Sequence, residues 1–351
     1  MIAERLSAQL LSGPPARDPV AVAERLLAIQ GQDPRGARLA IRARTSGLSA
    51  ADVDRALTEE RSLLITWLNR GTLHLVRRDD YPWLQALTTP QLVTGSARRL
   101  EQEGVSPDAA ERGVAIVERS LADEGPLNRA QLRERIAAAA VRTEGQALVH
   151  ILFLCSLRGL IVCGPTIAGE HAFALVRDWL GESQPVERGA ALRELARRYL
   201  IGHGPAEDRD LARWAGVPLR DARAGLEAIA PELDQRADGL VDLAGRAPPA
   251  DLPPPRLLGA FDPVLLGWRS REPLLSANQA IVTINGIFRP FALVRGRAAG
   301  TWSMPRGEVE LKPFGSLGTE DTAALEADAA DVLRFLRRRV SNSSHAPPSV
   351  E

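Results

Sequence analysis

One arrangement of secondary structure recurs along the chain: helical apolar periodicity is followed each time by two short strands that a tight turn joins. The predicted strand pairs are residues 63–68 with 72–76, 160–163 with 172–176, and 234–236 with 240–243. Several helices followed by a hairpin form the layout of a winged-helix module. We therefore predict an α+β fold that is mainly α, with three tandem winged-helix modules.

The domain boundaries follow from this repeat and from shifts in composition. We expect module 1 at residues 1–80, a helical connector at 81–103, module 2 at 104–180, module 3 at 181–247, a C-terminal β-rich region with a closing helix at 256–340, and a disordered tail at 341–351. Prolines at 248, 249 and 253–255 mark an extended linker before the β-rich region. Asn285-Gly286 between β-branched runs is a strong hairpin signal within that region.

Charge is balanced overall but unevenly placed. The 44 basic and 44 acidic residues give a formal net charge of zero, which argues against a protein that coats nucleic acid by bulk electrostatics. Residues 35–44 nevertheless contain several arginines and no acid, and residues 256–306 contain many arginines and few acids. These zones are either solvated faces or two phosphate-contacting surfaces that grip a duplex from two sides.

Cysteine usage and the N-terminus exclude several classes of protein. Cys155 and Cys163 lie in apolar surroundings, and the sequence has no CxxC pair or Cys/His ligand set, so we expect no disulfide framework, no metal site and no cofactor. Residues 1–5 do not begin a signal-peptide pattern, and no apolar run is long enough to span a bilayer. We expect a cytoplasmic, nucleoid-associated protein that does not bind membranes.

The segment around Gln30 and Gln32 interrupts an apolar helical pattern. The pattern of residues 21–29 breaks at Gly31 and Pro34, so we expect both glutamines at a helix-to-loop junction. Two amides two residues apart can converge on one small polar object, such as a water molecule or a sugar oxygen. The alternative is that both amides bind the free backbone groups at the helix end.

Three runs carry a family resemblance: residues 30–35 (Gln-Gly-Gln-Asp-Pro-Arg), 70–74 (Arg-Gly-Thr-Leu-His) and 260–263 (Ala-Phe-Asp-Pro). With them the chain resembles the AlkZ-like tandem winged-helix DNA glycosylases over nearly its whole length. The resemblance implies a C-shaped array of modules, a catalytic Gln-apolar-Gln motif at Gln30 and Gln32, and removal of alkylated purines by relatives best known for self-resistance to azinomycin-type antibiotics. Gly31 departs from this pattern, because the family usually has a bulkier apolar residue there.

An alkylated purine that carries a formal positive charge is already activated as a leaving group. The enzyme then has to stabilise an oxocarbenium-like sugar and place a water molecule at C1′, without protonating the base. Because a glutamine is no general base at neutral pH, the resemblance implies that Gln30 and Gln32 hold and orient the water. Relatives with a Gln-apolar-Asp motif have a carboxylate at the position of Gln32, so an amide there would narrow the substrates to lesions with good leaving groups.

Two neighbours of the motif have alternative roles. Asp33 either supplies the general base that the glutamines lack or caps the turn ahead of Arg35, as Asp before Pro commonly does. His74, on the returning strand of the first hairpin, is either a partly buried structural histidine or a contact to the lesion strand or to the catalytic loop. Arg70, at the turn of the same hairpin, is expected to bind DNA. Asp262 before Pro263 is expected to form a turn.

Further DNA contacts are expected from both basic zones. Arg35 and Arg38 follow the glutamine motif and are either helix-surface charges or phosphate contacts. Asn285 and Arg289 belong to a hairpin that resembles the one that family members are expected to place in the minor groove opposite the lesion. The alternative for this hairpin is a role in the core only.

The expected function is that of a monomeric, monofunctional DNA glycosylase. It would hydrolyse the N-glycosidic bond of cationic N7-alkylguanine, and by extension N3-alkyladenine, in double-stranded DNA, with bulky genotoxin adducts or interstrand crosslinks as substrates in base-excision repair or antibiotic self-resistance. Lys312 is the only lysine and lies far along the chain from the motif, which disfavours a Schiff-base lyase step. The alternative is a non-catalytic winged-helix transcriptional regulator, which should be dimeric and lose nothing when both glutamines become alanine.

Overall fold

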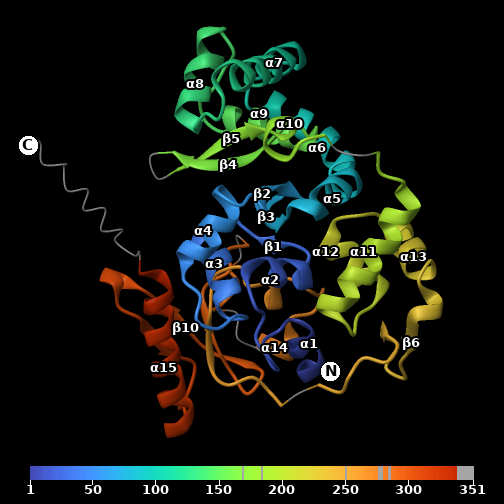
Figure 1. Cartoon of the computed structure of the whole chain (residues 1–351), viewed down its shortest axis with the longest axis vertical. Coiled ribbons are helices and arrows are strands. Elements are labelled where there is room, and N and C mark those ends of the chain that lie inside the picture. Colours follow the sequence, from blue (N-terminus) through green and yellow to red (C-terminus); the bar gives the residue numbers. More distant parts are fainter. Residues whose placement is uncertain (168–169, 183–184, 250, 276–279, 284–285, 338–351) are drawn as a thin grey trace, which may run out of the picture.

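The computed structural model describes residues 1–167, 170–182, 185–249, 251–275, 280–283 and 286–337. Helices dominate these residues, and short antiparallel strands join them (Figure 1). The helices are α1 (Ile2–Ala8), α2 (Pro19–Leu26), α3 (Pro34–Arg42), α4 (Ala50–Thr58), α5 (Tyr81–Thr88), α6 (Pro90–Gln102), α7 (Pro107–Glu124), α8 (Arg129–Ala138), α9 (Ala147–Leu157), α10 (Val176–Leu180), α11 (Arg188–His203), α12 (Asp208–Ala215), α13 (Leu219–Glu227), α14 (Glu272–Leu275) and α15 (Thr319–Leu336). The mainly helical α+β class is thus confirmed.

The largest sheet joins strands from two of the predicted modules. Its strands are β1 (Ile29–Gln30), β2 (Leu63–Leu68), β3 (Thr72–Arg77), β4 (Ile161–Ile167) and β5 (Glu170–Leu175), in the order β1-β3-β2-β4-β5. The predicted hairpins β2–β3 and β4–β5 are both present, and β2 pairs with β4 through Ile65 and Cys163. Strand β1 adds to the outer edge of β3. The pairing of β2 with β4 fixes the hairpin β4–β5 beside the hairpin β2–β3.

The remaining strands form two smaller sheets. The third predicted hairpin is present as β6 (Leu233–Gln235) and β7 (Val241–Leu243). The C-terminal region contains β8 (Arg256–Leu258), β9 (Phe291–Val294), β10 (Arg297–Ser303) and β11 (Glu310–Pro313), in the order β11-β10-β9-β8. The sequence pattern missed the outer strands β8 and β11. Asn285 and the expected tail at 341–351 lie outside the described residues, and the predicted closing helix is confirmed as α15 up to Leu336.

Three buried apolar clusters hold the elements together. One joins α7, α8 and α9 to the hairpin β4–β5 and includes Ile136, Leu152 and Phe173. Another joins α3 and α4 to the C-terminal sheet and α15, and its members include Ile41, Leu257 and Phe335. The third, largest cluster joins the first hairpin to α11 and α12. In Figure 1, α7 and α8 lie at the top, α11 and α13 at the right, and α15 at the lower left around β1 and α2. Within the described residues, no helix combines the length and the apolar character that a bilayer crossing requires.

A buried ion pair fixes α3 against the C-terminal region. The side chains of Arg44 and Asp262 are both 0% exposed, and their two hydrogen bonds measure 2.8 and 2.9 Å. The remaining donors of Arg44 bind the backbone carbonyl and side-chain oxygen of Gln9 and the carbonyl of Ala40. Asp262 also accepts the N–H of Val264 and so forms the expected turn. All the donors of a buried guanidinium therefore have partners, as burial of a charge requires.

The first turn of α3 lies unusually close to the C-terminal chain. A Cβ atom built on Gly36 would lie 2.3 Å from the carbonyl oxygen of Ala260, and one built on Gly259 would lie 3.0 Å from Gly36. Only glycine fits such an approach. Because α3 begins directly after the glutamine motif, this contact and the buried ion pair determine where the motif lies.

Candidate functional site

Gln30 lies on β1, which corrects the expected helix-to-loop junction. Helix α2 ends at Leu26, Leu27 has a positive φ of 64°, and the chain then enters the two-residue strand β1. There Gln30 pairs with His74 of β3. The Gln30 side chain is 6% exposed, and its Nε2 donates a hydrogen bond to Oε1 of Gln32 at 2.5 Å. The sheet thus holds the first glutamine rigidly, and the two amides converge on each other.

Gln32 is the exposed member of the pair. The N–H of Gly31 donates to the carbonyl oxygen of Leu73 at 2.7 Å, which fixes the backbone immediately before Gln32. A Cβ atom on Gly31 would meet its nearest neighbours, in Ile65, Leu73 and Leu75, at 3.6–3.7 Å, which is ordinary contact. The local fold therefore does not require glycine at the centre of the motif.

Asp33 caps helix α3. Its Oδ1 accepts the backbone N–H groups of Arg35 and Gly36, both at 2.9 Å, and Pro34 occupies the first helical position. This is the usual arrangement of an Asp N-cap followed by proline. One of the two roles considered for Asp33, the cap, is therefore present in the structure, while a part in catalysis remains a prediction.

His74 is buried and neutral. Its side chain is 3% exposed, and its Nδ1 lies 2.8 Å from the carbonyl oxygen of Thr72. Burial, helped by the nearby charge of Arg70, lowers the pKa of His74 to about 3. The imidazole therefore carries no charge at neutral pH, and the register places His74 opposite Gln30 on the strand that pairs with β1.

Arg70 joins the first hairpin to α12. Its Nη1 donates to the backbone carbonyls of Arg213 and Trp214, in the last turn of that helix. Burial, together with the charges of Arg213 and Arg271, lowers the pKa of Arg70 to about 10, so it stays cationic at neutral pH. A concentration of like charges at this point favours an anionic partner. The sequence pattern did not single out Arg213, because it comes near Arg70 only through the packing of the hairpin on α12.

The expected DNA-contacting arginines differ in their surroundings. Arg38 donates to Asp54 and to the carbonyl oxygen of Pro34, so its charge is already paired. Arg35 is exposed, and no described residue pairs with its guanidinium. Arg289 is exposed as well, and its N–H donates to the carbonyl oxygen of Ile281. Of these three, Arg35 is the guanidinium beside the motif that remains available to a phosphate.

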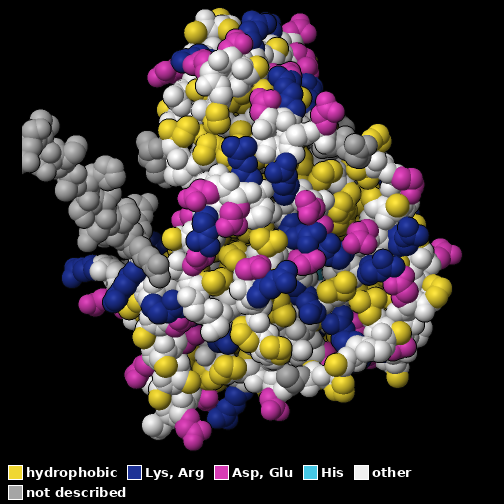
Figure 2. Space-filling view, viewed as in Figure 1, with side chains coloured by type: hydrophobic (Ala, Val, Ile, Leu, Met, Phe, Trp, Pro, Cys, Tyr) yellow, Lys and Arg dark blue, Asp and Glu magenta, His cyan; other side chains and the backbone are white. Residues whose placement is uncertain are grey.

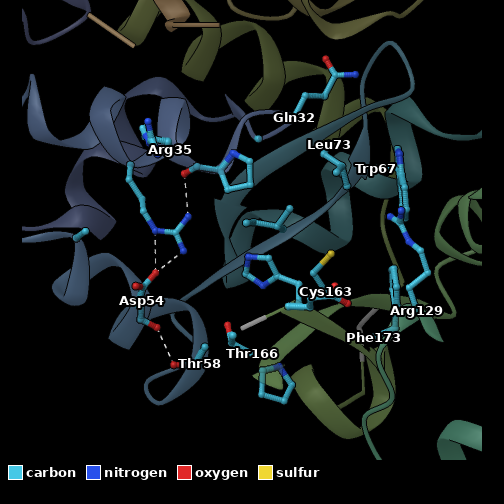
Figure 3. Close-up of a pocket in the computed structure, with 18 of the residues that line it drawn as sticks. Gln32, Arg35, Asp54, Thr58, Trp67, Leu73, Arg129, Cys163, Thr166 and Phe173 are labelled. Carbon is cyan, nitrogen blue, oxygen red and sulfur yellow. Dashed lines mark hydrogen bonds and ion pairs between the residues drawn. The ribbon is translucent and has the colours of Figure 1, made fainter. Parts of the chain in front are cut away.

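A cleft of about 810 Å³ opens beside the glutamine motif, over one face of the five-stranded sheet. Gly31, Gln32 and Arg35 line one part of it, and residues of α4, of α8 and of the strands β2 to β5 line the rest (Figure 3). In Figure 3, Trp67, Arg129 and Phe173 lie along one side, and Asp54 lies on the other. The sequence pattern missed these residues, because the cleft depends on the pairing of β2 with β4.

The described residues contain no group of three or more His, Cys, Asp or Glu side chains that could hold a metal ion. Cys155 and Cys163 are free thiols, and burial raises the pKa of each to about 12. Neither thiol is therefore a nucleophile at neutral pH.

On the face shown in Figure 2, basic side chains gather across the middle of the molecule, with acidic ones interspersed.

Comparisons with known proteins agree with one another. A family model described as DNA glycosylase AlkZ-like matches residues 23–335. An interstrand DNA cross-link repair glycosylase of Streptomyces sahachiroi is 26% identical in an alignment of 343 residues that covers 89% of this chain and 89% of the relative. The solved structure of the Streptomyces sahachiroi DNA glycosylase AlkZ superposes with a TM-score of 0.78 at 25% identity, over 95% of each chain.

Proposed function

Because the chain belongs to the AlkZ-like family of DNA glycosylases, we propose that it hydrolyses the N-glycosidic bond of cationic N7-alkylguanine, and by extension N3-alkyladenine, in double-stranded DNA. The helix–hairpin units then act as tandem winged-helix modules in a C-shaped array that holds the duplex. Gln30 and Gln32 are the catalytic pair in this proposal. The observation that carries it is the mutual hydrogen bond of these amides at the edge of an open cleft, one amide fixed by the sheet and the other exposed.

The reaction needs little beyond positioning. The bond between C1′ and the purine nitrogen breaks, and its electron pair moves to the purine and neutralises the positive charge. Water adds at C1′ to give an abasic sugar and releases a proton to solvent. The enzyme stabilises the electron-poor sugar and holds the water in line, which the amide oxygens and N–H groups can do.

The uncharged surroundings of the two amides fit a site that positions water and stabilises the sugar without protonating the base. Gln30 donates to the oxygen of Gln32, and no described residue donates to the amide oxygen of Gln30, which can accept a hydrogen bond from the attacking water. Among the described residues, none accepts the amide N–H groups of Gln32, which lie at the exposed side. His74 is neutral and its Nδ1 faces the carbonyl oxygen of Thr72, so it supports β1 without acting as an acid. A leaving group that needs no protonation suits a site built in this way.

Bulky adducts and crosslinks are the proposed lesions within this class. The Streptomyces sahachiroi relative is named as an interstrand DNA cross-link repair glycosylase, and this chain is similar to it over most of its length. An enzyme that reaches the sugar from outside the helix does not have to enclose the whole modified base. The exposed Arg35, the hairpin that includes Arg289, and Arg70 are the proposed contacts to the duplex.

The test uses a duplex that contains one N7-methylguanine, treated with the protein and then with hot alkali. Strand breaks appear only where an abasic site was formed. We expect breaks with the wild-type protein and a loss of at least 100-fold in the single-turnover rate for Gln30→Ala and Gln32→Ala. Gln102→Ala is a matched control, because Gln102 is an exposed glutamine at the end of α6.

Two results would contradict the proposal. Equal cleavage by the alanine variants would remove the roles assigned to the glutamines, and tight DNA binding without any base release would favour a transcriptional regulator. Specificity for cationic lesions is tested separately with Gln32→Asp. This variant should gain activity on neutral adducts relative to cationic ones, because a carboxylate can activate the water for a poorer leaving group.

A further inference from the structure

A second recess lies between the N-terminal segment and the hairpin β6–β7, and its lining residues are distinct from those of the cleft beside Gln32. It measures about 610 Å³. Its elements α1 and β6 both lie in the lower part of Figure 1. We propose that this recess binds a small phosphate ester, with the phosphate held by Arg25, Arg246 and Ser12. The inference concerns a ligand site apart from the reaction on DNA, so it does not rest on the proposed function.

Two guanidinium groups converge at the last turn of α11. Nη1 of Arg25 and Nη1 of Arg246 each lie 3.4 Å from the carbonyl oxygen of Ile201, so the two nitrogen atoms are within twice that distance of each other. Arg246 is also fixed by Asp242, whose Oδ1 accepts its Nε–H at 2.8 Å. Because a guanidinium has five N–H donors, both arginines keep donors for a ligand after these bonds are made.

Arg25 is the cation in the lining whose charge is not compensated. Arg246 already has a carboxylate partner, and Arg236 is paired with Glu4. No described carboxylate lies within ion-pair distance of Arg25, and burial together with the charge of Arg246 lowers the pKa of Arg25. Asp234, the remaining acid in the lining, is exposed, where water and salt screen its charge. An anion bound beside Arg25 would therefore relieve the repulsion between two partly buried cations.

An unsatisfied hydroxyl group provides a third donor. Ser12, in the loop after α1, lines the recess and is 9% exposed, and its buried Oγ has no hydrogen-bond partner among the described residues. Such an atom normally costs stability unless a ligand or water completes it. Three donor groups from three separate segments suit a phosphate, which has three acceptor oxygens, better than a carboxylate, which has two.

The recess has room for more than a phosphate group. Its volume falls in the range of pockets that bind small organic ligands, roughly 300–1,000 Å³. Leu10, Pro14, Leu243 and Pro248 contribute apolar side chains to the lining. These walls favour an ester with an apolar organic group. The phosphates of a duplex belong to an extended, wide backbone, which does not enter a recess of this size.

Isothermal titration calorimetry with the full chain measures the binding of phenyl phosphate and of inorganic phosphate at constant ionic strength. Arg25→Gln removes the uncompensated cation, and Ser12→Ala removes the unsatisfied hydroxyl group. Arg17→Gln is the matched control, because Arg17 is an exposed arginine just before α2 and lies outside the lining. None of these residues belongs to the proposed catalytic or DNA-binding set, so base release from the N7-methylguanine duplex should be unchanged in all three variants.

We expect wild-type protein to bind phenyl phosphate saturably and at least as tightly as inorganic phosphate, because the apolar walls contact the phenyl ring. Arg25→Gln should weaken this binding about tenfold or more, and Ser12→Ala about three- to tenfold, since each removes a donor to a charged acceptor. Arg17→Gln should leave the affinity unchanged. Without ligand, Ser12→Ala should be at least as stable as the wild-type protein, because the hydroxyl group has no partner to lose.

Several results would overturn the inference. They are the absence of saturable binding, binding of inorganic phosphate with exclusion of phenyl phosphate, and equal weakening by Arg25→Gln and Arg17→Gln, which would indicate attraction by overall charge. If Arg25→Gln weakened binding of an unmodified duplex but not of phenyl phosphate, the cation would serve DNA and the inference would be wrong. Ser12→Ala keeps the test decisive if Arg25→Gln does not fold: an unchanged affinity for phenyl phosphate would then contradict the site. The glycosylase assay can succeed or fail independently of all these results.

Discussion

Replacement of Asp262 by alanine tests whether the buried ion pair with Arg44 positions the segment that carries the proposed catalytic glutamines. Both side chains are fully buried, and the variant would leave the Arg44 guanidinium unpaired at that point. Two charge-assisted hydrogen bonds to Arg44 are lost, at 2.8 and 2.9 Å, each worth about 1.5–3 kcal/mol, and the N–H of Val264 loses its acceptor as well. Their sum agrees with the loss of about 3–5 kcal/mol that follows removal of one partner of a buried pair. We expect a decrease of that size in the free energy of unfolding.

Urea denaturation followed by circular dichroism measures this change, and base release below the unfolding transition reports the position of α3. The double variant Arg44→Met with Asp262→Leu should be less destabilised than Asp262→Ala alone, because it buries no unpaired charge. Glu124→Ala, which removes a partner of Arg135 in an exposed ion pair, should cause no measurable change.

Three outcomes would refute this reasoning. A loss below about 1 kcal/mol for Asp262→Ala would mean that this ion pair stabilises the protein no more than an exposed surface pair does. A double variant as unstable as the sum of the two single variants would show that the unpaired charge is not the cause. If the destabilised Asp262→Ala protein kept its full rate of base release, the ion pair would not be needed to position the glutamine motif.

Three further predictions concern neighbouring positions. In urea denaturation, Gly36→Ala should lower the free energy of unfolding by about 1–3 kcal/mol, because its Cβ would clash with a backbone carbonyl 2.3 Å away. Gly31→Ala should leave the stability unchanged, because its Cβ meets only ordinary contacts. Asp33→Asn preserves the N-cap and removes the carboxylate, so the rate of base release should change less than threefold; a fall of about 100-fold or more would identify Asp33 as the general base. Burial lowers the pKa of both His74 and His203 to about 3, so their stabilising contribution is present above the unfolded pKa and is lost as pH falls from about 6.5 toward 3. In measurements of unfolding at several pH values, His203→Phe should reduce the pH dependence of the free energy of unfolding over this range by one bound proton.

Local chemistry made the hairpins predictable. The turn Asn69-Arg70-Gly71 joins β2 to β3, and Asn69 and Gly71 both have positive φ values, 50° and 80°, which these residue types tolerate. The caps are equally local: Asn128 and Gln131 form a capping box at the start of α8. Such features depend on residues a few positions apart, so the sequence reveals them directly.

Contacts between distant segments could not be predicted in the same way. The two-residue β1 exists only because β3 offers a free edge, so apolar periodicity wrongly extended the preceding helix toward Gln30. The six residues of β2 are all buried, which is typical of a strand covered on both faces, but nothing in them specifies β4 as the partner. Asp262 was predicted as a turn former, and its ion pair with Arg44 becomes evident only in three dimensions.

The two glutamines of the proposed catalytic pair differ in burial, and this difference bears on whether each position could hold a carboxylate instead. Gln30 is fixed opposite a neutral histidine, where a carboxylate would lose much of its hydration. An amide at that position avoids this cost and still presents an oxygen to water. Gln32 is exposed, where an amide or a carboxylate could be accommodated. The burial pattern therefore favours variation at position 32 over position 30, so Gln32→Asp should fold normally while Gln30→Asp should lose stability as well as activity.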